Sequence, residues 1–214
     1  MTALKTTLVI ASENSNKIKE MNELVGEFFH LISFKDVSPK LSLPEEGVTS
    51  YEENAAQKAI YVGSETGLLS LGDDSGFEVA ALKNAPGVLS ARFANTKDAS
   101  VQRKEILRLI ANSPDRTSAF VCVLAIYDPQ NKKIHHFRGQ VNGKVSLTER
   151  GSHGFGYDSI FIPDGYSETF AELSTEIKNE ISHRALATNA LKRQWLSREE
   201  ASAFPQQIGE AVRH

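Results

Sequence analysis

The feature that most constrains the fold is an uninterrupted apolar run at residues 119–127. Such a run, rich in β-branched residues, is typical of a strand that other elements cover on both faces. The residues 128–131 after it, Asp-Pro-Gln-Asn, favour a turn. We therefore predict a central strand at 119–127, joined by an antiparallel return at 134–140.

Apolar periodicity predicts the remaining elements. Early in the chain a β-branched strand, a polar turn and a helix follow one another, an order that aims backbone N–H groups at an anion. Because strands and helices alternate early while the middle is antiparallel in pattern, we expect an α/β fold, a mixed β-sheet with flanking helices. Strands are predicted at 6–11, 32–37 and 77–82, and helices at 17–29, 50–66, 99–111 and 181–196.

Length and charge narrow the class of protein. A chain of 214 residues, 40% of them apolar, can bury one sizeable core. We expect a single domain at 1–196 and a tail of unknown role at 197–214. The net charge of -3 argues against a nucleic-acid partner, because such proteins usually carry a basic surplus.

The single cysteine and the N-terminus indicate the compartment. Cys122 lies inside the central apolar run, where a small buried hydrophobe is expected. One cysteine forms no internal disulfide, which fits a reducing environment. The apolar run at 8–11 is too short for a signal sequence or a membrane span, so we expect a cytoplasmic protein without a membrane partner.

A pair of carboxylates stands out in the middle of the chain. Asp73 and Asp74 lie between Gly72 and Gly76, a composition that predicts a tight turn after a buried strand. Carboxylates held there could bind Mg²⁺, which takes one or two of them together with waters and phosphate oxygens. A solvated turn without any ligand is the alternative.

Three other groups carry donors or a flat ring. Asn14 and Lys17 stand at a strand-to-helix junction, which suits a phosphate, although the glycines of a P-loop are missing. Phe155 lies between two glycines and could stack on a purine. Lys178, His183 and Arg184 lie at the predicted start of a helix, where an anion or a carbonyl-rich base would explain them. For each group an ordinary helix cap, core aromatic or surface charge is the alternative.

Taken together, these groups resemble the motifs of the inosine triphosphate pyrophosphatase family over roughly residues 6–190. Ser12 stands where the family usually has Thr, and Ser159 where it mostly has Pro. Gly47 directly follows Glu45 and Glu46, which leaves open the glutamate that approaches the metal. The segments that carry the resemblance are 11–17 (ASENSNK), 45–58 (EEGVTSYEENAAQK), 73–79 (DDSGFEV), 85–93 (APGVLSARF), 154–158 (GFGYD), 169–173 (TFAEL) and 178–184 (KNEISHR).

The resemblance implies an elongated fold of two lobes around a nucleotide cleft, a homodimer and a requirement for Mg²⁺. It implies hydrolysis of ITP, dITP, XTP and dXTP to the monophosphate and pyrophosphate. Asp74 would be the catalytic base and a metal ligand, joined at the metal by Asp73 and by Glu45 in preference to Glu46. The implied substrate-binding residues are Ser12, Asn14, Lys17, Lys58, Ser75 and Lys178 for the phosphates and Phe155, Gly156, Tyr157, Asp158, His183 and Arg184 for the base.

Two rival functions remain beside this interpretation. A related pyrophosphatase would act on modified pyrimidine or methylated nucleotides, and a substrate panel separates the two. A nucleotide sensor without catalysis would release no pyrophosphate, and the presence of both aspartates and all three lysines disfavours it. A nucleic-acid module conflicts with the net charge and with the lack of a basic and aromatic stripe.

Overall fold

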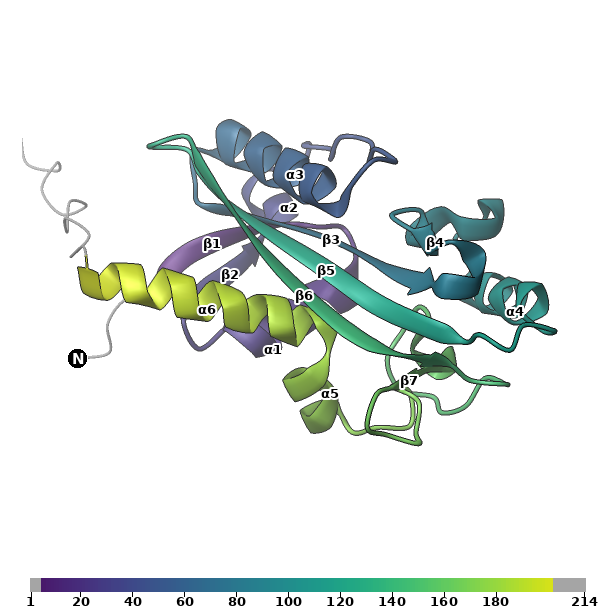
Figure 1. Cartoon of the computed structure of the whole chain (residues 1–214). Helices are drawn as coiled ribbons and strands as arrows, with labels where there is room; N and C mark the ends of the chain where they lie inside the picture. Colours follow the sequence, from purple (N-terminus) through teal and green to yellow (C-terminus); the bar gives the residue numbers. More distant parts are fainter. Residues whose placement is uncertain (1–4, 202–214) are drawn as a thin grey trace, which may run out of the picture.

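The computed structural model describes residues 5–201, which form an elongated sheet with helices packed along it (Figure 1). The sheet has seven strands in the order β2-β1-β3-β5-β6-β7, and β4 pairs with β3. The strands are β1 (Thr6–Ala11), β2 (Phe29–Ser33), β3 (Ser70–Val79), β4 (Ala85–Gly87), β5 (Thr117–Asp128), β6 (Lys133–Val145) and β7 (Phe161–Pro163). The helices are α1 (Ser15–Val25), α2 (Phe34–Val37), α3 (Tyr51–Thr66), α4 (Ala99–Leu109), α5 (Thr175–Ile181) and α6 (His183–Ala201), with 3-10 turns η1 (Ala80–Leu82), η2 (Ser90–Asn95) and η3 (Asp158–Ile160).

The predicted central strand is β5, and it is covered on both faces. Val121, Val123 and Ala125 pack against α3 on one face. Leu124 and Ile126 face the other way and pack with residues of α1 and α6. Since β1 pairs parallel with β2 and β3, while β3, β5 and β6 are mutually antiparallel, the predicted mixed α/β sheet is confirmed.

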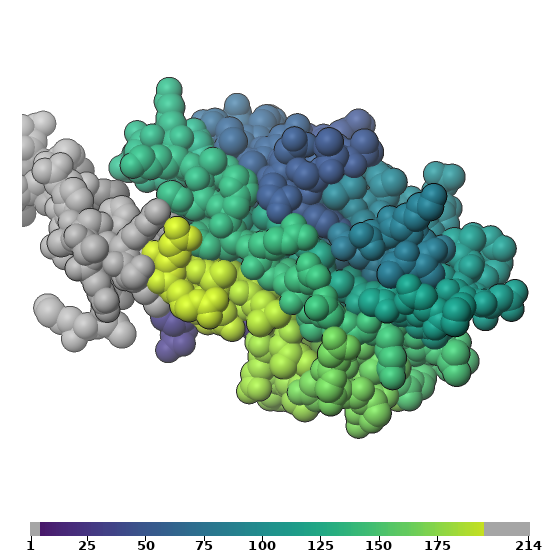
Figure 2. Space-filling view, viewed as in Figure 1, coloured from purple at the N-terminus to yellow at the C-terminus, as the bar shows by residue number. Residues whose placement is uncertain are grey.

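The two ends of the long strands carry different packing. At one end α1, α3 and α6 surround the sheet, whereas α4, β4 and β7 lie at the other end (Figure 1). The core at this second end is aromatic: Phe77 and Phe161 pack with Phe120 and Phe170. Figure 2, in the same orientation, shows α6 and the loops of residues 151–175 on one continuous face.

One edge of β3 is unpaired for a short stretch. β1 pairs with β3 as far as Gly72, and β4 pairs with it from Phe77 onward. Between these points residues 73–76 pair with β5 on one side only, within the described strand pairs. The sheet therefore has a gap along its edge at the two aspartates.

The prediction of a tight turn at residues 73–76 is wrong, because they lie inside β3. Asp73 and Asp74 tolerate the sheet interior because cations and an amide on neighbouring helices bind their carboxylates. Gly72 is required for close packing rather than for a turn, since a Cβ there would lie 2.0 Å from the carbonyl oxygen of Ala55 in α3.

Several element boundaries also differ from the prediction. The first helix ends at Val25 rather than 29, and residues 34–37 form α2 instead of a strand, because Ser33 and Asp36 make a capping box. The strand expected to reach 82 gives way to η1 after Val79. The helix predicted at 181–196 is α6, which begins at His183 and continues to Ala201, and the preceding α5 was not predicted.

Residues 202–214 of the predicted tail lie outside the described part of the chain. Among the helices of residues 5–201, none is both long enough and apolar enough to cross a bilayer.

Candidate active site

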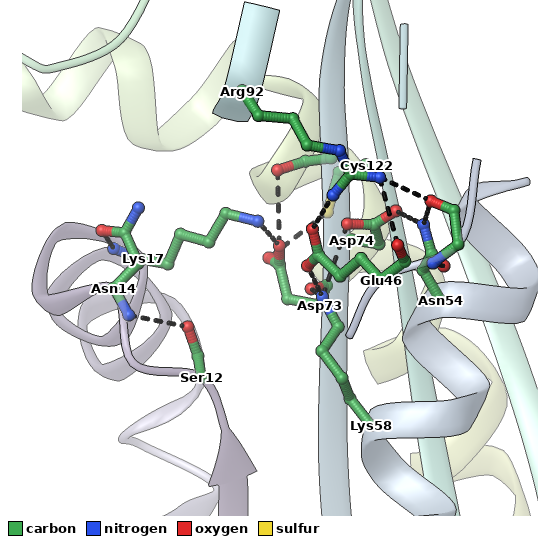
Figure 3. A network of polar contacts seen from close by, with 12 residues as sticks. Ser12, Asn14, Lys17, Glu46, Asn54, Lys58, Asp73, Asp74, Arg92 and Cys122 are labelled. Carbon is green, nitrogen blue, oxygen red and sulfur yellow. Dashed lines mark hydrogen bonds and ion pairs between the residues drawn. The ribbon is translucent and has the colours of Figure 1, made fainter. Parts of the chain in front are cut away.

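The site is built around adjacent carboxylates on opposite faces of β3. Successive side chains of a strand alternate between faces. Asp73 is opposite Leu124 of β5 and turns toward α1 and α6, whereas Asp74 is opposite Val123 and turns toward α3. Both are buried, and Figure 3 shows them at the centre of one polar network.

Cations enclose the carboxylate of Asp73. Lys17 Nζ lies 2.6 Å from Asp73 Oδ1, and Arg184 Nε lies 2.8 Å from Asp73 Oδ2. The Sγ of Cys122 lies 3.6 Å from the same Oδ2. Burial opposes the charge, but Arg184 and Lys17 outweigh it and hold the pKa of Asp73 well below its usual range. Asp73 is therefore an ionised anchor for two cations.

Asp74 has a weaker set of partners. Asn54 Nδ2 donates to Asp74 Oδ2 at 3.0 Å, and Lys58 Nζ lies 3.4 Å from Asp74 Oδ1. Burial raises the pKa of Asp74, and the attraction of Lys58 does not cancel that effect. Asp74 is thus the carboxylate of the pair that binds a proton more readily.

Glu46 completes this face of the site. Its Oε1 accepts from Lys58 Nζ at 2.7 Å, and the same ammonium group donates to the backbone oxygen of Asp73 at 2.6 Å. Although burial opposes its charge, Asp74 and Glu46 hold the pKa of Lys58 above the usual value. Glu45 is exposed, so Glu46 is the glutamate that the structure brings to Asp74 (Figure 3).

Two further residues, Arg92 and Asn54, contribute to this face of the site, and the sequence analysis did not predict them as site residues. Arg92, from η2, donates through Nη2 to the backbone oxygens of Glu46 and Gly47 at 3.1 and 3.0 Å, which fixes the glutamate loop. Asn54 accepts from the backbone N–H of Gly47 at 2.8 Å while it donates to Asp74. Both lie in segments that carry the family resemblance, 85–93 and 45–58, and that position was the only signal for them.

The strand-to-helix junction supplies a cap as well as a lysine. The Asn14 side chain accepts from the backbone N–H groups of Asn16 and Lys17 at 3.0 and 3.3 Å. Ser12 Oγ in turn accepts from the Asn14 N–H at 3.2 Å. Ser12 and Asn14 therefore set the direction in which α1 begins, and Lys17 extends from its first turn to Asp73. Ser75 Oγ accepts from Arg184 at 3.2 Å on the same face.

The glycine loop at residues 154–158 is folded around Asp158. Asp158 Oδ2 accepts from the Phe155 backbone N–H at 2.8 Å and from Lys178 Nζ at 2.7 Å. The Lys178 ammonium lies 5.1 Å from the centre of the half-buried Phe155 ring. Tyr157 turns the other way, stacks on Phe77 and donates to the Ser90 carbonyl, so its side chain belongs to the core.

His183 is buried at the start of α6. Its ring stacks on Phe120 with 4.7 Å between centroids, and Nδ1 has no hydrogen-bond partner among the described residues. Burial, followed by the charges of Arg184 and Lys178, holds the pKa of His183 well below its usual range. The ring is therefore held in its neutral form, and its Nδ1 is a buried polar atom without a hydrogen-bond partner among the described residues.

The predicted residues fall into two groups that share a partner. Glu20, on α1, accepts from both Lys178 and Arg184, and thereby joins the glycine loop to the aspartate cluster. The prediction that Lys178 begins the same helix as His183 is wrong, because Lys178 lies in the last turn of α5. Within the described chain no three His, Cys, Asp or Glu side chains form a ready-made metal cage.

The fold and the site together define a class: a mixed α/β protein in which lysines and an arginine surround two adjacent carboxylates, one of them protonatable, beside a gap in the sheet. The chain matches the model of the Ham1 family over residues 8–194. It belongs to the Ham1 family.

Relatives of this family are close in sequence and in structure. The chain is 42% identical over 183 residues to the dITP/XTP pyrophosphatase of Desulforamulus reducens, covering 84% of this chain and 90% of that protein. It is also 42% identical over 199 residues to the dITP/XTP pyrophosphatase of Agrobacterium fabrum, covering 85% and 92%. The solved Ham1 protein of Coxiella burnetii superposes with a TM-score of 0.82 at 35% identity, covering 90% and 99%.

Proposed function

We propose that this protein hydrolyses deaminated purine nucleoside triphosphates, namely ITP, dITP, XTP and dXTP, to the monophosphate and pyrophosphate. The curated relatives carry the name dITP/XTP pyrophosphatase at about 40% identity over most of the chain. The observation that carries the proposal is the asymmetry at β3, where Asp74 has a raised pKa and lies among Lys58, Lys17 and Glu46. Such a site provides both a base and the charge that a triphosphate requires.

The lysines suit the triphosphate end of the substrate. A nucleoside triphosphate carries about four negative charges, so phosphoryl chemistry depends on charge neutralisation and positioning. Lys17 and Lys58 come from different helices and reach the two faces of the same strand. Their ammonium groups are bound to carboxylates, which hold them in place for phosphate oxygens. Ser75, beside the gap in the sheet edge, adds a hydroxyl.

The carboxylates of the α3 face fit Mg²⁺. This ion is held in proteins by one or two carboxylates together with water and substrate phosphates rather than by a full protein cage. Asp74 and Glu46 both contact the ammonium group of Lys58, so their oxygens border a common space. Bound there, Mg²⁺ would neutralise phosphate charge and lower the pKa of a coordinated water. We assign Glu46 rather than Glu45 to it, and we assign Asp73 to anchoring Lys17 and Arg184.

Asp74 is the proposed base. A water molecule attacks the α-phosphorus, its proton passes to a carboxylate oxygen of Asp74, and pyrophosphate leaves with the electrons of the broken α–β bond. A general base works best when its pKa approaches the working pH. Burial moves the pKa of Asp74 in that direction. Asn54 holds one carboxylate oxygen, which orients the other toward the water.

The glycine loop and α6 suit the base of the substrate. The ring of Phe155 can stack on a purine, and aromatic faces stack on every base. Deaminated purines carry a 6-oxo group, whereas adenine carries a 6-amino group. Donors from His183 and Arg184 that meet the oxygen would face another donor if ATP bound, and such a buried mismatch can exclude a substrate by about 10⁴-fold. GTP shares the 6-oxo group, so its rejection must act at the 2-amino group.

A panel of triphosphates tests the proposal. We expect ITP, dITP and XTP to be hydrolysed far faster than ATP, with a monophosphate and pyrophosphate identified by chromatography. Comparable hydrolysis of ATP would contradict the base-edge argument, and a diphosphate with orthophosphate would show that another bond is cut. Preference for modified pyrimidine or methylated nucleotides would instead favour the related class of pyrophosphatase.

Two further proposals concern the oligomeric state of the protein and its cellular compartment. Leu89, Val101 and Leu109 are large apolar residues, 38%, 46% and 44% exposed, at the α4 end of the sheet. Leu109 also borders a hollow of about 290 Å³. These surfaces support a homodimer, which light scattering of the purified protein tests. The lone, buried Cys122 supports a reducing, cytoplasmic setting.

A further inference from the structure

An arginine of α4 reaches the glycine loop from outside the site. Arg103 Nη1 donates to the backbone oxygen of Gly156 at 2.8 Å, while its Nε donates to Glu149 Oε2 at 2.7 Å. Ser159 Oγ donates to the same glutamate oxygen at 3.3 Å. We call Arg103, Glu149 and Ser159 the Arg103 network.

The geometry of the network is that of a brace. The guanidinium is planar and presents its donors in a fixed fork, so binding Glu149 fixes the direction in which Nη1 meets Gly156. The side chains of Arg103 and Glu149 are 18% and 30% exposed, so the pair is largely shielded from water. Ser159 lies in η3, directly after the loop, and its contact with Glu149 joins the network to that end of the segment.

The loop needs such a brace at Gly156. This residue has a φ of +61°, and a Cβ built on it would meet nothing within 4 Å. Side-chain packing therefore does little to fix this peptide. Asp158 accepts from the backbone N–H of Phe155 through its side chain, and its own N–H donates to the Phe155 carbonyl. Arg103 binds the carbonyl of the following residue, Gly156, so the backbone is held on both sides of Phe155.

We propose that Arg103 is a positioning residue for base recognition, because it fixes the Gly156 peptide and with it the orientation in which Phe155 meets the purine. This inference rests on the proposed function. Without the brace the loop must be ordered when substrate binds, which weakens binding. Asp74 lies on β3 and, within the described chain, has no contact with the Arg103 network, so the substitution leaves the residues of the chemical step in place.

The first experiment separates binding from chemistry with Arg103→Met. We expect KM for ITP to rise about tenfold, in keeping with the loss of charge-assisted hydrogen bonds, while kcat stays within about twofold. Arg103→Lys, which keeps one donor group, should recover part of the KM. Inhibition by tripolyphosphate, which has no base, should not change. Arg108→Met is the matched control, since Arg108 lies on the same helix, is 69% exposed and pairs with Glu105.

The second experiment tests the brace without any turnover. Amide hydrogen exchange of residues 154–158 should be several-fold faster in Arg103→Met than in the wild type or in Arg108→Met. Unchanged exchange, an unchanged KM, or equal weakening of ITP and tripolyphosphate would each overturn the proposal. If the wild-type protein fails to hydrolyse ITP, the proposed function fails, and the exchange measurement still decides whether Arg103 holds the loop. Ser159→Ala offers a milder variant if Arg103→Met does not fold.

Discussion

The two faces of β3 treat adjacent aspartates in opposite ways. On the α1 and α6 face, Asp73 is bound by Lys17 and Arg184, and its pKa is held well below the usual range. On the α3 face, Asp74 has an amide and a more distant lysine as partners, and burial raises its pKa. The sequence repeats one residue type, but the neighbouring helices make one carboxylate an anchor and the other a base.

The comparison shows how a strand can build a site that is both rigid and reactive. A buried charge must be paired or its pKa shifts toward the neutral form. Full pairing at Asp73 fixes the positions of two cations, whereas incomplete pairing at Asp74 leaves a group able to accept a proton. Because the two side chains alternate across the strand, these requirements do not interfere with each other.

Asp74→Asn should have the largest effect, and it should fall on activity. The amide keeps the shape but accepts no proton, and loss of a general base costs about 10²–10⁴-fold in rate. Since burial disfavours the charge of Asp74, its removal should leave the thermal midpoint unchanged or slightly higher. We would measure kcat for ITP and the thermal midpoint. Near wild-type kcat would place the base elsewhere, and Asp164→Asn, at an exposed aspartate, is the control.

Asp73→Asn should show the reverse pattern. Removing one partner of a buried ion pair costs about 3–5 kcal/mol because the other charge is left uncompensated. For a domain of this size that lowers the thermal midpoint by roughly 6–20 °C. Activity measured well below that midpoint should fall less than in Asp74→Asn. A stable protein that is as inactive as Asp74→Asn would contradict the division of roles and return Asp73 to the metal site.

The sequence predicted the residue types of this site better than the local structure around the two aspartates. The central strand could be predicted from periodicity, and the two aspartates and Lys17 from their local pattern, whereas Lys58 and the glutamates came only from the family resemblance. The local environment of 73–76 could not, because Asp and Gly rarely occupy strand interiors. Only the helices that pack on β3, remote in sequence, bring Arg184, Lys17 and Lys58 to it. The carboxylates on this strand therefore looked like a turn until their partners were placed.

Other residues were hidden for similar physical reasons. Arg103 and Glu20 act through contacts with residues 53 and 164 positions away, respectively, which no local pattern encodes. The choice between Glu45 and Glu46 depended on which side chain turns toward α3. Tyr157, adjacent to a loop predicted to bind the base, turned into the core because its hydroxyl finds the Ser90 carbonyl.

The next prediction tests which of two neighbouring glutamates on the α3 face binds Mg²⁺. Glu46→Gln should raise the Mg²⁺ concentration needed for half-maximal activity by about 10- to 100-fold, a range seen even for outer-shell metal partners. Glu45→Gln, the matched control, should change it less than twofold because Glu45 is exposed. Removal of Mg²⁺ with a chelator should abolish turnover in all variants. Equal effects of the two substitutions would contradict the assignment of Glu46.

The smallest predicted effect concerns His183 on the Asp73 face, and it is a change in how the free energy of unfolding depends on pH. Burial opposes protonation of this imidazole most strongly, the charges of Arg184, Lys178 and Lys17 add to that opposition, and Asp73 favours protonation. The folded pKa of His183 is therefore below the unfolded value of about 6.5. Between these two values the unfolded chain binds the extra proton, so the free energy of unfolding falls as the pH falls.

His183→Gln should remove that slope, because glutamine does not titrate. Below about pH 6.5 the wild-type free energy of unfolding should decline by up to about 1.4 kcal/mol per pH unit more steeply than that of the variant. Above that pH the two curves should run parallel. Urea unfolding at a series of pH values measures both curves, and every other titrating group cancels in the difference. Parallel curves down to pH 5 would mean that folding does not lower the pKa of His183. In that case burial against Phe120 would not keep the proton off the ring, and the argument that a neutral imidazole meets the substrate would fail, while the anchor at Asp73 would stand.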